Sequence, residues 1–120
     1  MTHKSILFAA LLGLSSPAMA GAPSVVSAKA HATGMGWDFE VTVAHPDTGW
    51  DHYVDGWEVV AEDGTVLGYR KLHHPHVNEQ PFTRSLNNVM LPDGTRVVFI
   101  RVSCSEHGWS KELFEVAVRR

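Results

Sequence analysis

The chain has 120 residues, of which 44% are hydrophobic, 19% charged and 9% aromatic, and these values are typical of one ordinary globular domain. They exclude collagen-like, low-complexity and disordered chains. The formal charge of -3 and the sequence pI near 6.2 provide no cationic surface for a phosphate backbone, which argues against nucleic acid as a partner.

The first twenty residues have the pattern of a secretory signal peptide. Lys4 supplies a positive start, residues 5–14 are apolar apart from one serine and one glycine, and Ala18-Met19-Ala20 is a small-x-small cleavage pattern. The apolar stretch is shorter than the roughly 20 residues that a membrane-spanning helix needs. We therefore expect a signal peptide over 1–20 and an exported domain over 21–120, periplasmic or secreted, with no membrane association after cleavage.

Beyond residue 21 the dominant pattern is a two-residue alternation of apolar and polar side chains. Trp37, Phe39, Val41 and Val43 alternate with polar residues, as in a strand with one buried face. The dipeptide Asp63-Gly64 predicts a tight hairpin turn. The pattern predicts seven short strands and no helix, over residues 24–30, 37–43, 57–61, 65–70, 82–89, 96–104 and 113–118.

Seven short strands in about 100 residues, separated by Gly, Pro, Asp and Asn, are typical of an immunoglobulin-like sandwich. Residues 90–104 also resemble the corresponding region of a fibronectin type III domain. We therefore expect an all-β fold, a seven-stranded antiparallel sandwich of the immunoglobulin-like or fibronectin type III-like kind.

The histidines are concentrated in the connections that follow the second, fourth and sixth predicted strands. In such a sandwich these connections emerge at one pole. Imidazole is the commonest protein ligand for transition metals, and ligating rings usually donate their second N–H to a carboxylate or carbonyl. We therefore predict one transition metal ion at this pole, which gathers His45, His52, His73, His74, His76 and His107.

Cys104 is the single cysteine, so it forms no disulfide within the chain. It ends the sixth predicted strand, whose alternation directs it inward toward the base of the same pole. A thiolate and an imidazole three residues apart, Cys104 and His107, can contact one ion. A thiolate ligand favours iron, whereas a site made only of histidines suits copper or zinc.

The segment His73-His74-Pro75-His76 has two interpretations. Proline extends the segment, so its rings spread apart instead of stacking on one helical face. It is either a weak copper or nickel ligand or an ordinary polar loop.

Two motifs resemble the superoxide reductase family, also called desulfoferrodoxin or neelaredoxin. His45-Pro46 precedes His52-Tyr53 and an aromatic and acidic strand, and a late Cys-x-x-His-Gly pattern precedes a tryptophan. That family has an immunoglobulin-like sandwich and a mononuclear iron held by four equatorial histidines and one axial cysteine. The resemblance implies reduction of superoxide at iron, without release of dioxygen, and a redox partner. It implies equatorial ligands His45, His52 and His107, the axial ligand Cys104, and a fourth histidine at His31, with His74 or His76 as its replacement.

The same pole also suits a different class of function. Trp50, Tyr53 and Trp109 stand beside acidic residues, a composition found in aromatic-anchored protein interfaces and carbohydrate-binding surfaces. A metal-free binding module in the periplasm is therefore the alternative to a metal protein. The sequence leaves open the metal, the partner, the oligomeric state and whether the protein is an enzyme.

Overall fold

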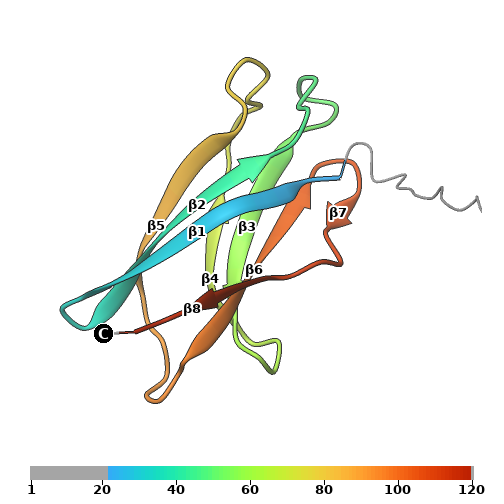
Figure 1. The fold of residues 1–120 in the computed structure, drawn as a ribbon. Helices are drawn as coiled ribbons and strands as arrows, with labels where there is room; N and C mark the ends of the chain where they lie inside the picture. The colour runs from blue at the N-terminus through green and yellow to red at the C-terminus, as the bar shows by residue number, and fades with distance from the viewer. Residues whose placement is uncertain (1–21, 120) are drawn as a thin grey trace, which may run out of the picture.

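The computed structural model describes residues 22–119, which form two antiparallel β-sheets facing one another and contain no helix (Figure 1). The predicted all-β, immunoglobulin-like sandwich is confirmed. The three-stranded sheet has the order β1 (Ser24–Thr33), β2 (Gly36–Ala44), β5 (Phe82–Val89). The five-stranded sheet has the order β4 (Val66–Lys71), β3 (Val54–Val60), β6 (Val97–Cys104), and both β7 (Gly108–Trp109) and β8 (Phe114–Ala117) pair with β6.

All seven predicted strands are present, and their bounds agree with the prediction within one residue except at β1 and β3. Strand β1 continues to Thr33, three residues past its predicted end. Strand β3 begins at Val54, three residues before the predicted start, because Val54 pairs with Cys104 at the end of β6. Strand β7 is an additional short strand that folds back on Cys104 directly after the turn. The predicted signal peptide, 1–20, lies outside the described residues.

The core lies between the two sheets and is built from the apolar positions of the alternating pattern. Phe39 and Phe82 of the three-stranded sheet are 1% exposed, and Trp57 and Ile100 of the five-stranded sheet are fully buried. Burying one side chain of this size contributes about 1.5–3 kcal/mol. Packing of these side chains holds the sheets together, since the single cysteine is free.

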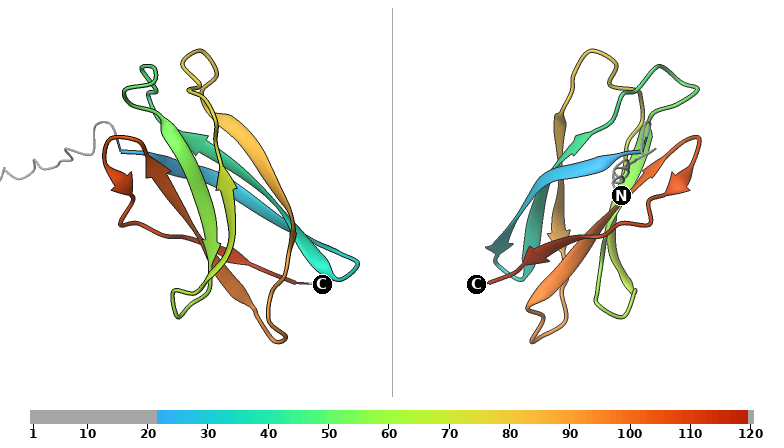
Figure 2. Two further views of the ribbon diagram at one scale, coloured as in Figure 1. Left: turned by 180° about the vertical axis from the view of Figure 1, so that it is seen from behind. Right: turned by 45° about the vertical axis from the view of Figure 1, so that its right-hand side comes forward.

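The connections alternate between the two ends of the sandwich (Figures 1 and 2). The turns β1–β2, β3–β4 and β5–β6 lie at one end, where Gly34, Gly64 and Gly94 adopt positive φ angles of 48°, 92° and 86°. Glycine accepts this backbone region without a Cβ clash. The connections β2–β3, β4–β5 and β6–β7 gather at the other end, which we call the histidine pole. No stretch of 22–119 forms a helix with the length and apolar character needed to cross a bilayer.

Candidate metal centre

The histidine pole is assembled by the register between β3 and β6. Val54 at the start of β3 pairs with Cys104 at the end of β6, so the residues just before β3 lie beside the turn after β6. Two hydrogen bonds join these segments: the Ser105 amide donates to the Tyr53 carbonyl at 2.8 Å, and the Tyr53 amide donates to Ser105 Oγ at 3.0 Å. His52 is thereby held next to Cys104.

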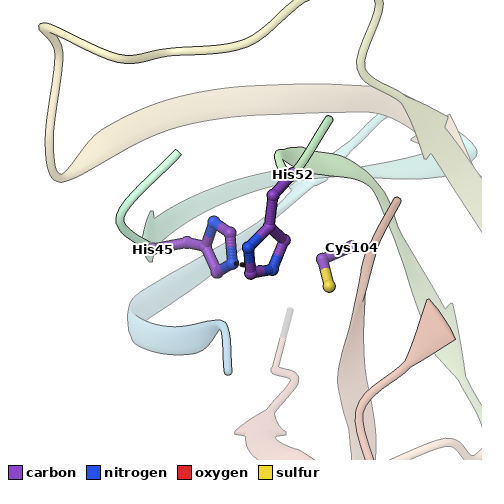
Figure 3. A group of neighbouring side chains, drawn as sticks. All are labelled: His45, His52 and Cys104. Carbon is purple, nitrogen blue, oxygen red and sulfur yellow. Dashed lines mark hydrogen bonds between the residues drawn. The ribbon is translucent and has the colours of Figure 1, made fainter. Parts of the chain in front are cut away.

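His45, His52 and Cys104 form a compact group of ligand atoms, all within 4.8 Å of one another. Figure 3 shows the two imidazole rings side by side, with the sulfur beyond His52. The Nε2 atoms of His45 and His52 are 3.2 Å apart, and their rings meet nearly edge to face at a centroid distance of 4.6 Å. His45 and Cys104 are buried, with 3% and 1% exposure.

The carboxylate of Asp47 determines how His45 is oriented. Its side chain is fully buried, and its Oδ1 lies 2.5 Å from His45 Nδ1. The backbone amides of Val54 and His76 donate to the same carboxylate at 3.2 and 2.8 Å. Because an ionised carboxylate only accepts hydrogen bonds, His45 carries its hydrogen on Nδ1 and presents the lone pair of Nε2 toward His52.

Gln80 holds the β4–β5 connection against the same histidine. Its Oε1 accepts a hydrogen bond from the His45 amide at 2.9 Å, and its Nε2 donates to the His76 carbonyl at 2.9 Å. Nothing in the sequence around Gln80 predicts its contact with His45, because the two residues are 35 positions apart in the chain. Asp47 had a local signal, because it stands two residues after His45.

His107 and Glu106 lie on the solvent side of His52. Glu106 Oε1 is 3.3 Å from His52 Nδ1, and the ring centroids of His52 and His107 are 5.1 Å apart. The His107 amide donates to Cys104 Sγ at 3.2 Å, and His107 Nδ1 is 3.5 Å from the sulfur. His52, Glu106 and His107 form a second group whose ligand atoms lie within 4.8 Å of one another.

The Nε2 atoms of His45 and His52 share one hydrogen-bonding position. Asp47 favours the hydrogen of His45 on Nδ1, and a neutral imidazole carries only one such hydrogen, so His45 Nε2 is an acceptor. His52 Nε2 then donates to it at 3.2 Å, and a metal ion between the two nitrogens would take the place of this hydrogen. Nitrogen ligands about 2.0–2.1 Å from an ion in tetrahedral geometry are about 3.3–3.4 Å apart, which fits this separation.

His74 and His76 lie at the pole but outside both groups. The His76 ring stacks on Phe82 at 4.0 Å, and neither of its nitrogens has a hydrogen-bond partner in the part of the chain that the structure describes. Its Nδ1 is 3.9 Å from Asp47 Oδ2, on the opposite carboxylate oxygen from His45. Burial lowers the pKa of His76, and Arg84 and His74 add to the effect. His73 and His74 are exposed, and the His74 ring lies 4.8 Å from that of His76.

The structure does not bring His31 to the metal centre, which corrects its assignment as the fourth histidine. His31 is exposed on β1 opposite Asp38, close to the β1–β2 turn at the far end of the sandwich. His45 follows Asp38 by seven residues, so about 23 Å of extended strand separate the two histidines.

The aromatic residues form two separate exposed pairs. Trp50 is 67% exposed and meets Tyr53 edge to face at 5.5 Å. Trp109 is 40% exposed, lies 6.2 Å from Tyr69, and has the Arg101 guanidinium over its ring at 4.8 Å. These pairs are surfaces that a partner can contact without metal.

The chain shares sequence with a known protein over most of its length. A protein of Halomicrobium mukohataei described as "Putative lipoprotein" is 39% identical to this chain over 85 residues. The match covers 71% of this chain and 41% of that protein, so the chain spans about two fifths of its relative's length. No family model and no solved structure match the chain. The likeness to superoxide reductases therefore rests on the two sequence motifs.

Proposed function

We propose that this protein is exported and binds one divalent transition metal ion at the histidine pole through His45, His52 and Cys104. The observation that carries the proposal is the pair of Nε2 atoms facing each other at 3.2 Å beside a buried sulfur. An ion between them would take the place of the hydrogen that they share and would bind both rings. His107, whose Nδ1 lies 3.5 Å from the sulfur, is the neighbouring residue that can complete the ligand set.

Each residue has a defined task in this centre. Asp47 holds the His45 hydrogen on Nδ1, which keeps Nε2 available as a ligand. The His107 amide donates to the Cys104 sulfur, an interaction that a metal-bound thiolate accepts. Imidazole and thiolate together select zinc, copper or iron over magnesium and calcium, which prefer oxygen ligands.

Export is supported by two independent features. The first twenty residues carry the charge, apolar stretch and Ala-Met-Ala pattern of a cleaved signal. The relative from Halomicrobium mukohataei is described as a lipoprotein, which is a protein of the cell envelope. We propose a location at the cell envelope or beyond it, with the periplasm as the specific site.

Metal binding is tested with metal-free, untagged protein and Co(II), whose thiolate complexes absorb in the near ultraviolet. We expect one ion per chain by calorimetry, and loss of the thiolate band in Cys104→Ser. His52→Ala should weaken binding by at least about tenfold, the effect of losing one ligand. His31→Ala is the matched control and should bind as the unchanged protein does, because His31 lies far from the pole.

Two results would refute the metal proposal. The first is the absence of both stoichiometric binding and a rise in melting temperature with any of these metals, since an ion at 100 times its Kd stabilises the fold by about 2.7 kcal/mol. That result favours the metal-free binding module, with the exposed Trp50 and Trp109 surfaces as its contacts. The second is equal loss of binding in His31→Ala and His52→Ala.

A superoxide reductase activity is the second candidate, favoured by the meeting of His45, His52, His107 and Cys104 at one pole. An iron ion held by these residues would supply the one electron that, with two protons, reduces superoxide to hydrogen peroxide. The protein's residues would hold the ion and shield the thiolate, and an external redox partner would return the electron. The test is superoxide consumption by iron-loaded protein. Consumption no faster than that of free iron, or unchanged in Cys104→Ser, would refute it.

A further inference from the structure

The two ligand groups at the histidine pole differ in their contact with solvent. We call His45, His52 and Cys104 the inner group, and His52, Glu106 and His107 the outer group. Two residues of the inner group are buried, whereas Glu106 and His107 of the outer group are both exposed. The Glu106 side chain is 56% exposed, against 16% for His52. Ligand atoms therefore continue from the solvent to the buried sulfur.

His52 is the link between the groups. Its Nδ1 lies 3.3 Å from the Glu106 carboxylate, and its Nε2 lies 3.2 Å from His45 Nε2. Its ring also meets the His107 ring at a centroid distance of 5.1 Å. The ring therefore offers one nitrogen to each group, and an ion that leaves the outer group exchanges His52 Nδ1 for His52 Nε2 as it reaches the inner group.

We propose that the outer group is a capture site, which takes a hydrated divalent metal ion from solution and passes it through His52 to the inner group. This inference rests on the proposed function. A hydrated ion loses its waters stepwise, and it cannot reach a buried sulfur first. The exposed carboxylate of Glu106 is accessible to the hydrated ion, and its negative charge attracts the ion from solution.

The transfer balances without a redox change. Glu106 and His52 Nδ1 are released from the ion, and His45 Nε2, His52 Nε2 and Cys104 Sγ replace them. The ring hydrogen of His52 moves from Nε2 to Nδ1 through solvent, and the Cys104 thiol gives its proton to water as the metal–sulfur bond forms. The thiolate holds a borderline metal more tightly than a carboxylate does, so the ion ends in the inner group. Glu106 binds the ion during its entry but not once the ion is in the inner group. It should therefore accelerate metal loading and metal release by the same factor.

The test follows Co(II) entering the metal-free protein by stopped flow, using the thiolate-to-cobalt absorbance. This signal appears only when the ion reaches Cys104. In Glu106→Gln we expect both loading and chelator-driven release to slow about tenfold at low ionic strength, the size of effect expected for one charge close to a divalent ion. The equilibrium Kd should stay within about twofold, and added salt should shrink the difference in rates.

Glu112→Gln is the matched control, since Glu112 is also exposed, lies in the chain between β7 and β8, and loses the same charge. It should load at the unchanged rate. The inference is overturned if Glu106→Gln loads normally, if Glu112→Gln slows as much, or if Glu106→Gln raises the Kd while loading stays fast. Absence of any thiolate band in the unchanged protein is a different result, which refutes the proposed function itself.

Discussion

Replacing Asp47 with asparagine removes the ionised acceptor that orients His45. The carboxylate accepts from His45 Nδ1 and the Val54 amide on Oδ1, and from the His76 amide on Oδ2. An asparagine oxygen can keep the first two hydrogen bonds, but its NH2 group then faces the His76 N–H. Two buried donors would meet where one hydrogen bond existed, so both the fold and the metal centre should be weakened.

The magnitude follows from burial and the number of bonds. Leaving a buried amide donor unsatisfied costs about 1–3 kcal/mol, and Asp47 is 5% exposed. For a domain of this size, such a cost lowers the melting temperature by on the order of 10 °C. Loss of the residue that orients a metal-ligating histidine typically reduces affinity about 10–100-fold, so the Kd for Co(II) or Zn(II) should rise by that factor.

Urea unfolding of the metal-free protein measures the stability of Asp47→Asn, and calorimetry measures its metal affinity. Long-range nitrogen–proton NMR correlations report which ring nitrogen of His45 carries the hydrogen. Asp93→Asn is the matched control, because Asp93 is exposed in a turn at the opposite end and loses the same charge. A variant that keeps its metal affinity within about twofold would contradict the assigned role of the carboxylate, for which a loss of at least tenfold is expected.

Two further predictions concern stability. His76→Phe keeps the stack on Phe82 and removes two buried nitrogens without hydrogen-bond partners, so the free energy of unfolding should rise by about 1–3 kcal/mol at neutral pH. Burial lowers the pKa of His76 in the folded protein below its ordinary 6.5, so the unfolded chain binds more protons at this residue. The free energy of unfolding should therefore fall as the pH drops below 6.5. Urea unfolding of His76→Phe should show a smaller decline over the same pH range. If His76→Phe is less stable than the unchanged protein at every pH, the His76 imidazole stabilises the fold and this prediction is wrong. Arg101→Met should cost about 1–3 kcal/mol because it leaves Glu58, whose side chain is 7% exposed, without its guanidinium partner. Adding Glu58→Gln should recover part of that cost, and strictly additive costs in a double-mutant cycle would contradict the pairing.

The strands were predictable because their signal is local and periodic. Alternating residues such as Phe39, Val41 and Val43 bury one face of β2, and Asp63-Gly64 turns the chain between β3 and β4 as predicted. The alternation fails at the start of β3, where Gly56 and Glu58 on the outer face are buried as well. A strand covered on both faces loses the period of two, so its first residues could not be recognised.

Sequence by itself determined that Ig-like strand order brings the β2–β3, β4–β5 and β6–β7 connections to one end, since alternate connections in a sandwich share a pole. Only the tertiary structure decided which residues meet there. His45 reaches His52 because Asp47 and Gln80 fix its ring and backbone, and His52 reaches Cys104 because of the β3–β6 register. Such contacts depend on the relative placement of segments that are far apart in the chain. Neither residue spacing nor periodicity carries that information.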